Sequence, residues 1–94
     1  MQDFIGRIAS STDGQLAAGL SSYPVPPSTS GCRLVVTGSG TVRVGMGEFV
    51  PTADSGALVV SGVPVALDVR RSGNDVVHLF ASGTAQMNLV FQSR

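Results

Sequence analysis

The chain has 94 residues, of which 43% are apolar and only 13% are charged. This length suits one domain with its own core, and the composition excludes a disordered tail, which needs low hydrophobicity and high charge. The net charge is zero, all six basic residues are arginines, and the longest basic run is Arg70-Arg71. Nucleic-acid binding therefore has no electrostatic basis, and the low charge indicates that other protein covers part of the surface.

The first 31 residues differ in character from the rest. Their apolar residues near the start form too short a run to predict a helix, and residues 21–31 are rich in serine and proline, which is typical of an extended segment. The sequence predicts an extended N-terminal arm over residues 1–31 and a β domain over residues 32–94. We expect the arm to lie on a neighbouring subunit, with packing across its own domain as the alternative. Its candidate anchors are Phe4, Ile5, Ile8, Leu16, Leu20, Tyr23 and Val25.

From residue 32 onward, short runs of β-forming residues alternate with glycine-containing turns. The predicted strands cover residues 33–37, 41–46, 57–61, 65–70, 76–81 and 85–92. The short link at residues 38–40 predicts a hairpin between the first two. The fold class is therefore all-β, a small antiparallel sandwich or barrel of about six strands, and a meander is the simplest wiring.

The last two predicted strands give the clearest pattern. Residues 76–81 are apolar on nearly both faces, which suits a central strand. Along residues 85–92 one face is apolar and the other is mainly polar, as expected for a strand with one side on a core. The predicted inward residues of this strand are Ala85, Met87, Leu89 and Phe91.

No motif predicts catalysis, a cofactor or a metal site. The glycines between residues 38 and 47 match neither the dinucleotide nor the Walker pattern. His78 shares a strand face with Val76 and Phe80, so we interpret it as a packed or interface side chain. Cys32 is the only cysteine, and we interpret it as a small buried hydrophobe. The sequence therefore predicts a protein without enzymatic activity, cofactor or metal.

The sequence also bears on carbohydrate binding and on membrane association. The polar row of Gln86, Asn88 and Gln92 could contact carbohydrate, but aromatic residues are scarce, so a solvated or subunit-contacting face is favoured. The first seven residues lack the apolar stretch of a signal peptide, and no window is long enough to cross a bilayer. We expect a soluble protein made in a cytoplasm, with no membrane partner.

Three segments resemble the small all-β virion proteins of tailed bacteriophages. They are PTADSG at residues 51–56, SGVPVALDV at 61–69 and DVVHLFASGTAQMNLVF at 75–91. In such proteins a Gly-Val-Pro turn often leads into a strand, and an Ala-x-Gly-Thr-Ala hairpin follows near the end. The resemblance covers roughly residues 33–92 and does not include the arm.

The resemblance implies a non-enzymatic virion part, made in the host cytoplasm, that forms homo-oligomers and binds another virion protein such as the major capsid protein. A capsid decoration or cement protein is the first hypothesis. A tail, head-to-tail or fibre component is the alternative within this class, and a small carbohydrate- or receptor-binding module is the alternative from a different class. If the arm joins subunits, removing residues 1–25 should leave a folded β domain that no longer assembles.

Overall fold

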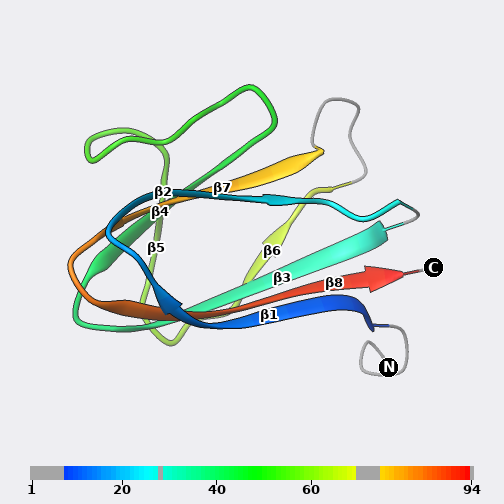
Figure 1. Cartoon of the computed structure of the whole chain (residues 1–94), viewed down its shortest axis with the longest axis horizontal. Coiled ribbons are helices and arrows are strands. Elements are labelled where there is room, and N and C mark those ends of the chain that lie inside the picture. Colours follow the sequence, from blue (N-terminus) through cyan, green and yellow to red (C-terminus); the bar gives the residue numbers. More distant parts are fainter. Residues whose placement is uncertain (1–7, 28, 70–74, 94) are drawn as a thin grey trace.

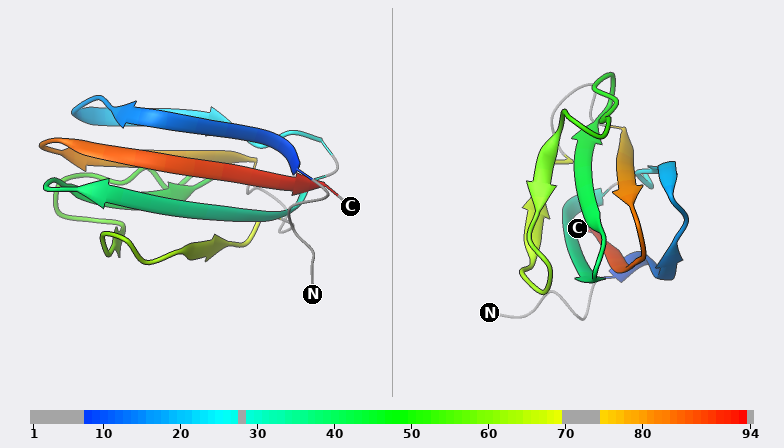
Figure 2. Two further views of the ribbon diagram at one scale, coloured as in Figure 1. Left: turned by 90° about the horizontal axis from the view of Figure 1, so that it is seen from below. Right: turned by 90° about the vertical axis from the view of Figure 1, so that its left-hand side faces the viewer.

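A computed structural model describes residues 8–27, 29–69 and 75–93, and these residues form an all-β structure. Two four-stranded antiparallel sheets pack face to face as a sandwich (Figures 1 and 2). The described part of the chain contains no helix, and hence none that could span a membrane. The strands are β1 (Ile8–Leu16), β2 (Gly19–Pro24), β3 (Thr29–Gly38), β4 (Thr41–Met46), β5 (Ala57–Val59), β6 (Val65–Leu67), β7 (Val76–Ser82) and β8 (Ala85–Ser93).

The strand order follows one rule. Sheet A has the order β1-β8-β3-β6 and sheet B the order β2-β7-β4-β5. Each strand of the first half pairs with its counterpart from the second half, β1 with β8, β2 with β7, β3 with β6 and β4 with β5. This is the arrangement of a long hairpin rolled into two layers, the jelly roll.

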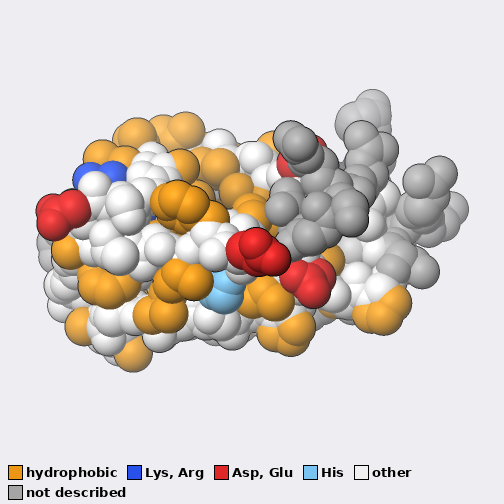
Figure 3. Space-filling model, turned by 90° about the horizontal axis from the view of Figure 1, so that it is seen from above, with side chains coloured by type: hydrophobic (Ala, Val, Ile, Leu, Met, Phe, Trp, Pro, Cys, Tyr) orange, Lys and Arg blue, Asp and Glu red, His pale blue; other side chains and the backbone are white. Residues whose placement is uncertain are grey.

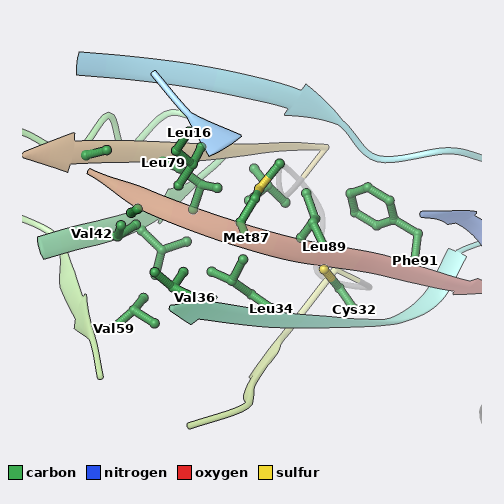
Figure 4. Packing of buried hydrophobic residues seen from close by; sticks show 14 of the residues in the cluster. Leu16, Cys32, Leu34, Val36, Val42, Val59, Leu79, Met87, Leu89 and Phe91 are labelled. Atoms are coloured by element: carbon green, nitrogen blue, oxygen red, sulfur yellow. The ribbon is translucent and has the colours of Figure 1, made fainter. Parts of the chain in front are cut away.

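The core lies between the two sheets and follows the alternation of side chains along the central strands. In β8 the predicted inward residues are all buried, and β7 buries every second residue. Side chains from both sheets point toward one another in the space between them (Figure 4). The buried cluster is Leu16, Cys32, Leu34, Val36, Val42, Val44, Val59, Val69, Val77, Leu79, Ala81, Ala85, Met87, Leu89 and Phe91.

The all-β class and the six strands predicted from residue 33 onward are confirmed. The predicted segments match β3 to β8, with β5 and β6 shorter than expected. The position of residues 76–81 in a central strand is also confirmed, because β7 lies between β2 and β4. His78 lies half-buried on the outer side of this strand, between the buried residues Val77 and Leu79.

The described part of the predicted arm belongs to the sandwich. Residues 8–16 and 19–24 form β1 and β2, which pair with β8 and β7 as the two edge strands at one side of the molecule. The predicted boundary between residues 31 and 32 falls inside β3. These two strands were not predicted from the sequence because an edge strand of this kind buries few side chains. Leu16 is the one residue fully buried in the described part of the two strands, so apolar alternation is weak there.

The predicted hairpin of residues 33–46 and the meander wiring are wrong. β3 and β4 are consecutive in sequence but lie in different sheets. The turn between them packs on the β7–β8 turn, where the Gly40 backbone N–H donates to the Thr84 carbonyl oxygen at 2.7 Å. A Cβ on Gly40 would lie 2.5 Å from the Ser82 carbonyl oxygen, so a residue without a side chain is needed there.

Candidate interaction surface

The outer face of sheet B carries an apolar row that crosses all four strands. The strand register places Leu20, Phe80, Arg43 and Leu58 side by side from β2 to β5. Leu20 and Leu58 are 49% and 56% exposed, and the two residues between them are half-buried. Outward-facing strand positions are usually polar where water covers them. This row therefore has the character of a surface that another molecule covers.

A hydrogen-bonded histidine lies in the next row. His78 Nε2 lies 2.8 Å from the Gly47 carbonyl oxygen, and its Nδ1 lies 2.7 Å from Ser22 Oγ. Because a carbonyl oxygen can only accept, Nε2 carries a proton in this arrangement, and in the neutral ring Nδ1 accepts from the Ser22 hydroxyl. The imidazole thus joins the edge strand β2 to the start of the β4–β5 loop. Both polar ends of the ring are satisfied within the chain.

The β4–β5 loop, residues 47–56, folds back onto the same face. A Cβ on Gly45 would lie 2.5 Å from the Phe49 carbonyl oxygen and 2.8 Å from the Phe49 ring. Arg43 Nη1 donates to the Gly56 carbonyl oxygen at 2.9 Å, which fixes the other end of the loop. Phe49 and the neighbouring Val50 remain 52% and 47% exposed. The loop therefore adds an aromatic side chain to the apolar row.

These elements make up a surface that we call the sheet B face. In the space-filling view, orange hydrophobic side chains lie on both sides of the pale blue histidine, and red acidic side chains lie close beside it (Figure 3). Exposed apolar side chains gathered in this way make the face the candidate interaction surface of the described chain. The sheet B face consists of Leu20, Ser22, Pro24, Arg43, Phe49, Leu58, Val76, His78 and Phe80.

The predicted arm anchors lie in three different places. Leu16 is buried in the chain's own core, and Tyr23 and Val25 are half-buried against it. These three side chains therefore follow the alternative stated for the arm, packing across its own domain. Leu20 is the described anchor whose side chain points outward, on the sheet B face. Ile8 begins β1, while Phe4 and Ile5 lie outside the described residues.

The Ser22–His78 pair has the spacing of a nucleophile and its base, with the ring oriented by a third group. It lies on an exposed strand face, whereas surface hollows of about 530, 480 and 360 Å³ are lined by other residues. The buried Cys32 is not an alternative nucleophile, because burial raises the pKa of its thiol to about 12 and keeps it protonated at neutral pH. Within residues 8–27, 29–69 and 75–93, no three His, Cys, Asp or Glu side chains gather to hold a metal.

Sequence reasoning missed Ser22, Phe49 and Leu58 as members of this surface. Ser22 lies 56 positions from His78 in the chain, so their contact depends on a pairing between distant strands. The exposure of Leu58 follows from its outward position on the edge strand β5. Two signals were available from the sequence: Leu20, which was named as a candidate contact residue, and His78, whose shared face with Val76 and Phe80 was recognised from alternation.

The described chain is thus an eight-stranded antiparallel sandwich with jelly-roll order and an apolar outer face on one sheet. Comparisons with protein-family models, with curated proteins and with solved structures find no significant match to it.

Proposed function

We propose that this protein is a non-enzymatic structural part of a tailed-phage virion, a capsid decoration or cement protein that assembles with copies of itself and with another virion protein such as the major capsid protein. The observation that carries the proposal is the sheet B face. The jelly-roll order supports it, since viral capsid domains and lectins are among the proteins that use this architecture. Because one fold serves many functions, the argument depends on the surface.

Covering the sheet B face removes exposed apolar area from water. Leu20, Phe49 and Leu58 are each about half exposed, and burial of apolar area contributes roughly 25 cal/mol per Å². A few well-packed side chains near the centre of a contact supply most of the binding energy of protein interfaces, and aromatic residues and arginine are enriched among them. Association through this face therefore has a clear driving force.

A second copy of the chain is the occupant that fits best. Among the residues that define the face, Arg43 is charged, and its guanidinium donates to the Gly56 carbonyl oxygen. Acidic side chains lie beside the histidine (Figure 3). A two-fold contact would bury the same apolar patch on both copies.

Under this proposal, Leu20 is the described residue of the N-terminal segment that makes a subunit contact. Leu20, on the outer side of β2, supplies a contact residue at the edge of the sheet B face. The segment is held in place by Leu16, which is buried in the core, and by Tyr23 and Val25, which pack against the core. The N-terminal segment thus contributes to assembly as a strand of the sandwich.

Leu58→Asp is expected to weaken self-association at least 10-fold, because it places a carboxylate in the apolar row. The matched control is Ala66→Asp on sheet A. Both residues are exposed on an edge strand, and each lies opposite an arginine of the next strand, Arg43 for Leu58 and Arg33 for Ala66. Sedimentation velocity over a range of concentrations measures the effect. An equal loss in both variants, or none in Leu58→Asp, would remove the sheet B face as the contact.

A further inference from the structure

A second surface lies on the opposite side of the sandwich, on the outer face of sheet A. A hollow of about 360 Å³ is lined by Asp13, Gly14, Val35, Thr37, Gln86, Met87 and Asn88. This volume is at the lower end of the range for ligand sites. The hollow lies over three adjacent strands, β1, β8 and β3, and so has a floor of paired backbone.

The strand register places the polar groups of the hollow close together. Asp13, Asn88 and Val35 form one row across the three strands, and Gln86 and Thr37 belong to the next row. Neighbouring strands lie about 4.8 Å apart, and successive outward residues of one strand about 7 Å apart. Four polar side chains therefore surround an area the size of one sugar ring, with Val35 as an apolar contact among them.

These four polar groups are available to a ligand. In the described part of the chain, no hydrogen bond joins the side chain of Asp13, Thr37, Gln86 or Asn88 to another residue. Together they offer carboxylate acceptors, amide donors and acceptors, and a hydroxyl that does both. Adjacent hydroxyls on a ring present the complementary set, since each can donate and accept.

Other ligand classes fit this chemistry less well. An anion such as phosphate would meet the Asp13 carboxylate and no basic side chain among the lining residues. A metal ion would find one carboxylate, with no second His, Cys, Asp or Glu in the lining. A nucleobase needs an aromatic platform, and the lining contains none. We infer that the outer face of sheet A binds a neutral saccharide through Asp13, Thr37, Gln86 and Asn88.

The saccharide site and the proposed assembly contact use different residues on opposite sheets, so both can operate in the same molecule. The hollow is on sheet A, so association through the sheet B face leaves it open to solvent (Figure 2). Without an aromatic platform, each single site is expected to bind its sugar weakly. Repetition of the site in an assembly raises the overall avidity by effective concentration.

The test is a titration of the intact ¹⁵N-labelled chain with glucose, galactose and N-acetylglucosamine, and with their disaccharides, followed by amide chemical shifts. We expect saturable shifts at the hollow with at least one of these sugars. Asp13→Ala should weaken binding at least 10-fold. The matched control is Gln15→Ala, which removes a polar, exposed residue from the same face of β1 outside this hollow.

Three results would overturn the inference. They are no saturable shift with any sugar of the panel, shifts centred on another face, and equal effects of Asp13→Ala and Gln15→Ala. If Asp13→Ala does not fold, Asn88→Ala replaces it. The Leu58→Asp variant separates this inference from the assembly proposal, because a non-associating chain should bind the sugar with unchanged affinity per site.

Discussion

Deletion of residues 1–18 is expected to unfold the domain. The deletion removes β1, which pairs with β8 from Ile8 opposite Gln92 to Leu16 opposite Ala85. It also removes the Leu16 side chain from the core and leaves the apolar strand β8 as an unprotected edge. A domain of this kind is stabilised by only about 5–15 kcal/mol in total. Urea titration followed by far-ultraviolet circular dichroism should therefore show no cooperative transition in the shortened chain.

The single substitution Leu16→Ala serves as the graded control. Its side chain is 3% exposed, and removal of a buried leucine side chain costs about 2–5 kcal/mol. This variant should keep a cooperative transition at a lower urea concentration. A shortened chain as stable as the full one would contradict the structure and support the separate arm expected from sequence composition.

Gly40→Ala is expected to destabilise the sandwich by about 1–3 kcal/mol or more, the usual cost of forcing atoms into a closely packed place. The added Cβ would lie 2.5 Å from the Ser82 carbonyl oxygen and 2.9 Å from that of Thr84. Both atoms belong to backbone, so the β7–β8 turn has to move away. The hydrogen bond from the Gly40 N–H to Thr84 would be strained at the same time. The urea midpoint at constant slope measures the loss.

Ser39→Ala is the matched substitution within the same turn. Ser39 is exposed, and a surface change of this type alters stability by about 0.5 kcal/mol or less. A similar midpoint for both variants would mean that the β3–β4 and β7–β8 turns do not pack on each other as described.

The strand positions were predictable because alternation is a local property. In β8 the period of two identifies Ala85, Met87, Leu89 and Phe91 as inward residues, and all four are buried. The order of the strands was not predictable, since every pairing except that of β4 with β5 joins strands that are not consecutive in the chain. β1 and β8 are at opposite ends of the chain. No local pattern distinguishes a turn that closes a hairpin from one, such as Ser39-Gly40, that crosses between sheets.

The candidate surfaces also combine features that local alternation predicts with features that depend on the strand pairing. The shared face of His78 and Phe80 followed from alternation, whereas the row that joins Leu20 to Leu58 required the register of three strand pairs. Polar edge strands were also difficult to predict from the sequence. The β1 sequence IASSTDGQL is specified mainly by backbone pairing with β8, and such a sequence has the same composition as an irregular segment.

The proposed virion role is tested most directly by the copy number of this protein in purified particles from its source, measured by quantitative mass spectrometry. The proposal predicts a number comparable with that of the major capsid subunit, as expected for a decoration or cement protein. A number equal to a few rings of subunits would assign the protein to the tail, the head-to-tail junction or a fibre. Absence from every particle would contradict the virion role and favour a small saccharide- or receptor-binding module.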